Sequence, residues 1–87
     1  MQEYHLKIST PSGTVYDGMA FFLSVRGISG DLAILAGHIP FVTGIKKCLC
    51  KIRCSDETEK SAECDGGLLT VGKDIVHVLT SGFKWLD

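Results

Sequence analysis

This sequence lacks most of the features that mark enzymes, membrane proteins and nucleic-acid-binding proteins. Its 87 residues carry 9 Lys and Arg against 10 Asp and Glu, so no basic surplus suggests binding to nucleic acid or to anionic lipid. No apolar run approaches the ~18–20 residues that are needed to cross a bilayer. The N-terminal residues also lack the basic start and apolar core of a signal peptide. We therefore expect one small globular domain in the cytoplasm, with no nucleic-acid partner.

Catalytic motifs are missing as well. The sequence contains no Gly-x-Ser-x-Gly, no P-loop and no pair of carboxylates that would fall in an apolar cleft. The serines lie in turns or at polar strand positions without a neighbouring histidine. His5 and His77 occupy polar or rim positions of predicted strands, and no His-x3-His spacing is present. We expect no enzymatic activity, no metal site and no cofactor.

Helical periodicity is absent, and alternation with a period of two takes its place. Tyr4, Leu6 and Ile8 alternate with polar residues, and a second strand places an inward row at Met19, Phe21, Leu23 and Val25. Further strands are predicted at residues 14–17, 32–35, 41–47, 48–54, 59–65, 68–71 and 75–80. Short strands separated by turn signals predict an all-β fold, a small β-sandwich or flattened barrel of antiparallel strands, over residues 1–80. Residues 81–87 follow no strand pattern and are predicted to form a short tail.

The most distinctive segment is GISGDLAILAGHIPFVTGI, which runs from Gly27 to Ile45. Gly27 and Gly30 bracket a tight reversal, and the apolar residues that follow, 32–35, predict a buried strand. A second glycine turn then displays His38 before Pro40 redirects the chain. The segment presents loops and holds neither a nucleophile nor a phosphate-binding motif.

Four cysteines, Cys48, Cys50, Cys54 and Cys64, allow more than one interpretation. Alternation places the first three on one strand face together with Ile52, where they act as small hydrophobic residues. Free structural thiols are the favoured interpretation. Zinc ligands remain an alternative, although no Cys-x2-Cys pair is present, and disulfides are the least favoured. A hairpin tip at Asp56-Glu57-Thr58 would set Cys50 directly opposite Cys64.

The run GDLAILAGHIP, followed by Thr43 and Ile45, closely resembles the signature of the epsilon subunit of bacterial F-type ATP synthase. The resemblance extends in register over residues 4–79, with further matches at Tyr4-His5-Leu6, Tyr16-Asp17-Gly18, Lys46, Ile52-Arg53 and residues 66–71. It implies the N-terminal β-sandwich domain of a non-catalytic rotor subunit. Such a subunit links gamma to the c-ring and couples ion translocation to ATP synthesis. It is peripheral to the cytoplasmic side of the cell membrane, as part of the complex.

The resemblance also implies which residues contact these two partners. Positions beside the gamma subunit are matched by Thr10, His38 and Thr43. Positions in a loop that faces the polar loops of the c-ring are matched by Ser29, Gly30 and Asp31. From residue type alone, His38 is equally an exposed turn histidine, and Asp31 a turn carboxylate that bonds its own backbone.

Several positions depart from the family pattern. Relatives often carry polar residues at Phe21 and Phe22, and one of these two aromatics must face outward, either as a partner contact or as a lone exposed ring. Relatives usually have Pro-Gly at Lys47-Cys48, and often glycine at Ala33 and proline at Ala36, which leaves the local loop shape open. The helical hairpin that follows this domain in typical epsilon subunits is missing. We expect a natural short form without ATP binding.

Two alternatives come from other functional classes. A carrier domain of the lipoyl or biotinyl type is also a small β-barrel, but its modified lysine is flanked by methionine or alanine, unlike Lys73 in Gly72-Lys73-Asp74. A cysteine-based metal-binding module is the other alternative.

Overall fold

The computed structural model describes residues 2–37, 39–54 and 58–86. It contains nine strands and, within these residues, no helix. The strands are β1 (Tyr4–Thr10), β2 (Gly13–Gly27), β3 (Gly30–Ile34), β4 (Phe41–Ile45), β5 (Cys48–Cys54), β6 (Glu59–Cys64), β7 (Gly67–Val71), β8 (Ile75–Thr80) and β9 (Phe83–Trp85). The predicted all-β class is confirmed, and β8 has the bounds that its alternation predicts.

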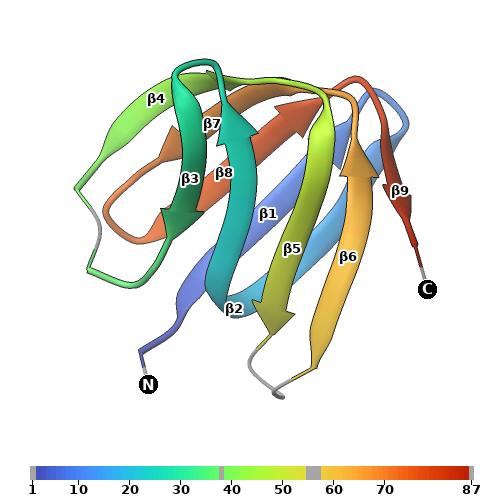
Figure 1. The fold of residues 1–87 in the computed structure, drawn as a ribbon. Coiled ribbons are helices and arrows are strands. Elements are labelled where there is room, and N and C mark those ends of the chain that lie inside the picture. The colour runs from blue at the N-terminus through green and yellow to red at the C-terminus, as the bar shows by residue number, and fades with distance from the viewer. Residues whose placement is uncertain (1, 38, 55–57, 87) are drawn as a thin grey trace.

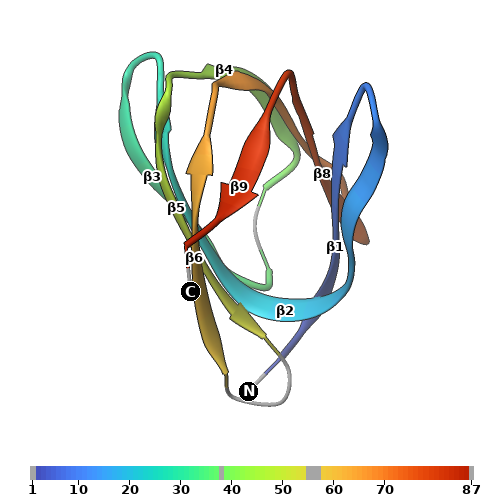
Figure 2. The same ribbon diagram turned by 90° about the vertical axis from the view of Figure 1, so that its right-hand side faces the viewer.

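The strands form two layers that share β2 (Figures 1 and 2). Pairing runs in the order β1-β8-β7-β4-β2-β5-β6-β9, β3 lies beside β2, and β1 also pairs with β2. The first half of β2 pairs with β1, and its second half pairs with β3 and β5. Figure 2 shows β2 crossing from one layer to the other at the lower end of the molecule. We call β1, β8, β7, β4 and the first half of β2 sheet 1, and β3, β5, β6, β9 and the second half of β2 sheet 2.

The core lies between the two sheets and is made of alternate strand residues. Its largest fully buried aliphatic side chains are Leu6, Ile8, Leu23, Ile52, Leu69, Val71, Val76 and Val78. Each contributes about 1.5–3 kcal/mol by leaving water. Tyr4 joins the two sheets, because its buried hydroxyl donates a hydrogen bond of 2.7 Å to the Ile34 carbonyl on β3.

β2 is one strand of 15 residues, where the sequence analysis predicts two. Its pairing with β5 shifts between Ala20 and Phe22, as in a β-bulge. A bulge reverses the alternation of faces along a strand. As a result Ala20 and Phe21 are both buried, whereas Met19 is 42% exposed. The prediction that Met19 belongs to the inward row is therefore wrong.

The apolar run at residues 32–35 is an edge strand and not a fully buried one. Strand β3 pairs with β2 alone. Ile34 is buried, but Ala33 is exposed and Leu35, which follows the strand, is 53% exposed. Sheet 2 packs on the core with one face only, so only alternate residues of β3 enter the core.

The β5–β6 hairpin corrects the predicted cysteine pairing. Cys48, and not Cys50, lies opposite Cys64. The backbone N–H of Cys54 donates to the Thr58 carbonyl at 2.9 Å, so the turn is centred one residue earlier than predicted. Residues 56 and 57 of the predicted tip lie outside the described residues.

The interpretation of the cysteines as buried free thiols holds for three of the four. Cys50, Cys54 and Cys64 are buried, Cys48 is half-buried, and all four are free. Burial, together with the neighbouring Cys64 and Cys48, raises the pKa of the Cys50 thiol to about 12. Cys50 is therefore protonated at neutral pH and acts as a hydrophobic core residue.

Strand β9 forms within the segment that is predicted to have no strand pattern. It pairs with β6. Its Trp85 ring lies edge-on to Phe83, with ring centroids 5.1 Å apart, and the Lys60 ammonium lies 5.4 Å from the Trp85 centroid. These ring contacts stabilise a strand that is too short to be predicted from alternation.

Candidate protein-interaction site

The outer face of sheet 1 carries apolar side chains where alternation would permit polar ones. On each strand, the residues between the buried ones point away from the core. On β4, β7 and β8 these outward residues are Val42, Gly44, Leu68, Thr70, Ile75, His77 and Leu79. The apolar members of this set need an explanation other than folding, because their side chains do not enter the core.

Four exposed apolar residues lie on this face or beside it, and we call them the apolar patch: Ile28, Val42, Leu68 and Leu79. Their side chains are 60%, 62%, 41% and 43% exposed, respectively. Leu68 lies directly opposite Leu79 on β8 and opposite Gly44 on β4. Ile28 covers Gly44, where an added Cβ would lie 3.1 Å from the Ile28 Cγ2. The glycine at position 44 thus lets Ile28 extend the patch beyond the edge of sheet 1.

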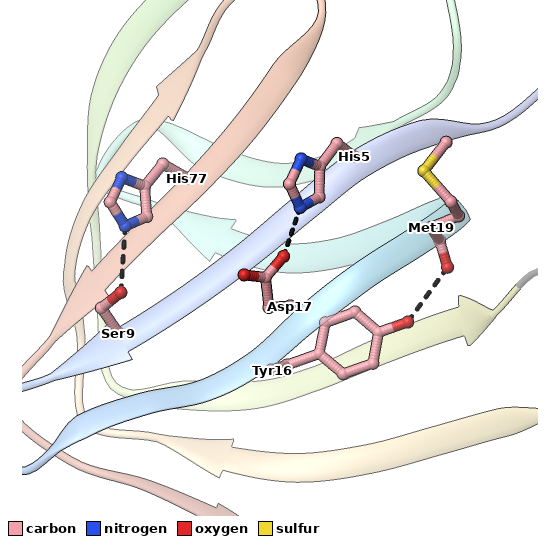
Figure 3. Close-up of polar contacts among 6 residues, drawn as sticks. All are labelled: His5, Ser9, Tyr16, Asp17, Met19 and His77. Carbon is pink, nitrogen blue, oxygen red and sulfur yellow. Dashed lines mark hydrogen bonds and ion pairs between the residues drawn. The ribbon is translucent and has the colours of Figure 1, made fainter.

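The same face carries polar pairs on β1, β8 and the first half of β2, which Figure 3 shows. His5 pairs with Asp17, and His77 Nε2 lies 3.1 Å from the Ser9 hydroxyl. The hydrogen bond with His5 lowers the pKa of the exposed Asp17 carboxyl. The face therefore combines apolar residues on β4, β7 and β8 with polar pairs on β8, β1 and β2.

The β2–β3 hairpin lies next to the apolar patch and is held there by backbone hydrogen bonds. Gly27 pairs with Gly30, so Ile28 and Ser29 form its tip. The Ile28 N–H donates to the Gly44 carbonyl at 3.1 Å, and the Lys46 N–H donates to the Arg26 carbonyl at 2.9 Å. The predicted tight reversal is confirmed. Ile28 belongs both to the hairpin and to the patch.

Asp31 pairs with a neighbouring side chain on this hairpin. Its Oδ1 accepts a hydrogen bond of 3.1 Å from the Arg26 Nε, and the two side chains are 79% and 62% exposed. Ser29 and Gly30 beside it are exposed. The three residues with predicted c-ring contacts thus lie together on one exposed hairpin.

The predicted gamma-contact residues are not brought together in the described structure. Thr10 ends β1, and its hydroxyl bonds within the turn to Gly13 and Ser12. Thr43 lies in β4 opposite the buried Leu69, so its half-buried side chain belongs to the inner row. Strands β8 and β7 separate β1 from β4. His38 lies outside the described residues.

Phe21 and Phe22 divide between the two faces as alternation requires. Phe21 is buried, and Phe22 lies half-buried on the outer face of sheet 2. The Arg53 guanidinium lies 5.4 Å from the Phe22 ring centroid. The outward aromatic is thus covered by a cation from its own chain.

The apolar patch was missed by the sequence analysis, although a signal for it was present. Adjacent apolar residues within a strand must point to opposite faces, so one of the two points outward. Such pairs occur at Phe41-Val42, Leu68-Leu69 and Val78-Leu79. That their outward members meet on one surface follows only from the pairing of β4, β7 and β8.

Features of other functional classes are not found in the part of the chain that the structure describes. Within residues 2–37, 39–54 and 58–86, no three His, Cys, Asp or Glu side chains are grouped so that they could hold a metal ion. The same residues include no helix with the length and apolar character needed to cross a membrane.

Comparison with known proteins identifies a family for nearly the whole chain. Residues 3–86 match the model of the ATP synthase, Delta/Epsilon chain, beta-sandwich domain. The ATP synthase epsilon chain of Bacillus velezensis is 42% identical over 79 residues, which are 91% of this chain and 59% of that protein. The sodium-ion-specific ATP synthase epsilon chain of Acetobacterium woodii is 32% identical and is matched over 97% of this chain and 63% of its own length. The chain thus spans about three fifths of these relatives.

Solved structures show the same fold. A chain in the cryo-EM structure of the Euglena gracilis mitochondrial ATP synthase (OSCP/F1/c-ring) superposes with a TM-score of 0.89 at 16% identity. The match covers 98% of this chain and 56% of that one. A chain in the Tetrahymena thermophila central stalk and c-ring structure superposes with a TM-score of 0.79 at 15% identity, over 94% of this chain and 66% of that one. The carrier-domain and metal-module alternatives are not favoured by these matches.

Proposed function

This chain belongs to the ATP synthase delta/epsilon chain family, and we propose that it is a non-catalytic subunit in the rotor of an F-type ATP synthase. It links the gamma subunit to the c-ring, so that rotation of the ring turns gamma. It is held at the cytoplasmic side of the cell membrane through the complex. A packed two-sheet body suits this role, because close-packed interiors deform little under load.

The observation that carries the proposal is the apolar patch on sheet 1. An exposed group of large apolar side chains on a strand face marks a surface that a partner covers. We assign this surface to gamma. Thr10, His38 and Thr43 remain proposed gamma contacts, since a stable interface needs ~1,000 Å² or more. The Thr43 side chain lies in the inner row of β4 and is not part of the outer surface that carries the patch.

The β2–β3 hairpin supplies the second contact. Ser29, Gly30 and Asp31 are exposed at the edge of the patch, and we assign them to the polar loops of the c-ring. Because the Ile28 and Lys46 backbone bonds fix the hairpin to β4, a load on one contact passes directly to the other. The short path between the two contacts supports a coupling role.

The experiment compares two leucines that both point outward from strands. Leu79 lies in the apolar patch and is 43% exposed, whereas Leu49 lies on the outer face of sheet 2 and is 60% exposed. Titration with the cognate gamma subunit measures Kd for Leu79→Lys and for the matched control Leu49→Lys. We expect Leu79→Lys to weaken binding roughly 100-fold or more, because it buries an unpaired ammonium at the interface, and Leu49→Lys to bind as the wild type does.

Both variants should remain folded, since each changes an exposed side chain outside the core. Circular dichroism checks that condition before binding is measured. Wild-type affinity in a folded Leu79→Lys variant would show that gamma docks elsewhere. Equal loss in both variants would remove the assignment to sheet 1.

A further inference from the structure

Three of the four cysteines lie close together on the inner side of β5 and β6. Cys48 and Cys50 are alternate residues of β5, and Cys64 ends β6. Cys48 is directly opposite Cys64, while Cys50 is opposite Ala62. Cys54 is four residues further along β5, next to the turn. The register therefore singles out one directly opposed pair of free thiols.

Strand geometry favours a bond in that pair over the other combinations. The Cys54 N–H donates to the Thr58 carbonyl, and hydrogen-bonded pairs recur at every second residue, so Cys48 and Cys64 form such a pair. Their Cα atoms are therefore about 5.5 Å apart, within the ~4.4–6.8 Å that a disulfide needs. Cys50 and Cys64 are diagonal neighbours, about 7–8 Å apart. Cys48 and Cys50 are two positions apart on the same strand, about 6.6 Å, with side chains that stand parallel. Of these combinations, Cys48 and Cys64 have the Cα spacing of a disulfide. Since the Cβ atoms of a hydrogen-bonded pair lie about 5.5 Å apart and a disulfide needs ~3.5–4.5 Å, the two strands must also move closer together when the bond forms.

The two sulfurs also differ in exposure. Cys64 is fully buried, and its Sγ lies 3.6 Å from the Thr80 hydroxyl. Cys48 is half-buried and lines a surface hollow with Arg26, Leu49 and Lys51. The Arg26 backbone N–H donates to the Cys48 Sγ at 3.4 Å. An oxidant in solution can reach the Cys48 sulfur, whereas Cys64 is shielded from solvent beside it.

From this arrangement we propose that Cys48 and Cys64 form a peroxide-responsive thiol pair, in which Cys48 is oxidised first and Cys64 resolves it to a disulfide. The Cys48 thiolate attacks one oxygen of hydrogen peroxide; an S–O bond forms, the O–O bond breaks, and the leaving hydroxide takes up a proton to become water. The Cys64 thiol then gives up its proton and attacks the Cys48 sulfur. The S–S bond forms, the S–O bond breaks, and a second water leaves.

Oxidation in this way joins β5 to β6 at the end where β6 continues towards β7. The sulfurs lean towards Arg26 and Thr80 in the reduced state, so each side chain rotates towards the other when the bond forms. The two thiols lie on the inner side of sheet 2, and Cys48 lines the same hollow as Asp31. The oxidation uses no residue of the apolar patch. It therefore does not depend on the proposed contact with gamma.

Intact mass after treatment of the full chain with hydrogen peroxide tests the proposal. We expect the wild type to lose two hydrogens and to regain them with dithiothreitol. Tryptic digestion of the oxidised chain should yield the peptide of residues 48–51 linked to the peptide of residues 61–73. Cys54→Ala and Cys50→Ala are the matched controls and should lose two hydrogens as the wild type does.

Cys48→Ala should keep all its thiols reduced, and Cys64→Ala should stop at a sulfenic acid that dimedone captures on residue 48. If Cys64→Ala does not fold, the contrast between Cys48→Ala and Cys54→Ala decides the question. The proposal is overturned if Cys48→Ala still loses two hydrogens, or if Cys50→Ala no longer does. A disulfide that joins two chains, or oxidation of Cys48 without any disulfide, would overturn it as well.

Discussion

The outer faces of the two sheets obey the same alternation but expose different chemistry. On sheet 1, the outward positions of β4, β7 and β8 include Val42, Leu68 and Leu79. On sheet 2, the outward positions are mostly charged and include Arg26, Asp31, Lys51, Arg53, Glu59, Glu63 and Lys84. The fold requires apolar residues only on the inner faces, so the difference between the outer faces does not arise from folding.

The charged face satisfies its own groups, and the apolar face does not. Arg26 pairs with Asp31 and Arg53 with Glu59 on sheet 2. The apolar side chains of the patch on sheet 1 are exposed to water. Covering them with a partner is favourable, because it removes apolar surface from water. We therefore propose that the apolar patch of sheet 1 faces a partner, and that the outer face of β5, β6 and β9 on sheet 2 is the solvent side.

The largest expected effect comes from a substitution that separates β7 from β8, the two strands that carry Leu68 and Leu79 of the apolar patch. Gly67 has a φ of +147°, and a Cβ there would lie 2.0 Å from the Leu79 carbonyl oxygen. We expect Gly67→Ala to lower the free energy of unfolding by about 4 kcal/mol or more, because β7 must move away from β8. Urea denaturation measures the change.

Gly30→Ala on β3 is the matched control. Its φ of +136° is also unfavourable for alanine, but a Cβ there has nothing within 4 Å. We expect a loss of only about 1–2 kcal/mol, from backbone strain alone. If the two variants were equally stable, β7 would not pack against β8 as closely as the structure shows.

A smaller effect is expected from loss of the buried hydrogen bond between Tyr4 on sheet 1 and Ile34 on sheet 2. Tyr4→Phe removes the buried hydroxyl that donates to the Ile34 carbonyl. We expect a loss of about 1–2 kcal/mol, since the carbonyl is left without that donor. The Tyr16 hydroxyl donates to the Met19 carbonyl at an exposed site and lies 3.4 Å from the Cys54 Sγ, a weak acceptor. Tyr16→Phe should therefore cost less in the same denaturation experiment. A larger cost for Tyr16→Phe would contradict this ranking.

Alkaline pH tests the inner side of sheet 2. Burial raises the pKa of Cys50 from 9.0 to about 12, so the folded chain keeps a proton that the unfolded chain loses above pH 9. This contribution to stability is complete below about pH 9 and is lost as the pH rises towards 12, with about 1 kcal/mol lost by pH 10. Burial raises the pKa of Tyr4 too, which adds to the loss at higher pH.

The comparison of Cys50→Ala with Cys48→Ala isolates the thiol. Between about pH 8 and pH 10, the free energy of unfolding of Cys50→Ala should fall less than that of the wild type. Cys48→Ala removes a half-buried thiol and should retain most of the wild-type slope. Parallel slopes in the wild type and Cys50→Ala would show that Cys50 does not titrate differently on folding.

Sequence reasoning predicts most strands here and misses what depends on pairing. Alternation alone places β1, β5 and β8, because their inner residues are apolar in strict order. Alternation mispredicts Met19, because the bulge between Ala20 and Phe22 depends on how β2 pairs with β5 and cannot be inferred from β2 alone. The pairing of Cys48 with Cys64 depends on the centre of a turn, and a one-residue error there moves every partner by two positions.

The candidate site divides in the same way. The glycines at 27 and 30 are local signals, and they predict the hairpin that carries Asp31. The apolar patch joins residues from the hairpin, β4, β7 and β8. The sequence of any one of these segments does not predict which strands lie beside it. Outward apolar residues can be counted from the sequence, but their assembly into one surface requires the fold.

The smallest expected effect on stability is the loss of an exposed ion pair on the outer face of sheet 2. Arg53 and Glu59 lie opposite each other on sheet 2, with Nη2 and Oε2 3.2 Å apart and side chains 46% and 51% exposed. Such a pair contributes little, because water screens the charges and both side chains lose freedom. We expect Glu59→Gln to change the free energy of unfolding by about 0.5 kcal/mol or less, and about 0.5 M NaCl to abolish the difference. Arg53→Gln should cost slightly more, since it also uncovers the Phe22 ring. A cost above about 1 kcal/mol for Glu59→Gln that persists in salt would mean that the charges on sheet 2 hold the fold together, and the outer face of sheet 2 could then no longer be regarded as merely the solvent side.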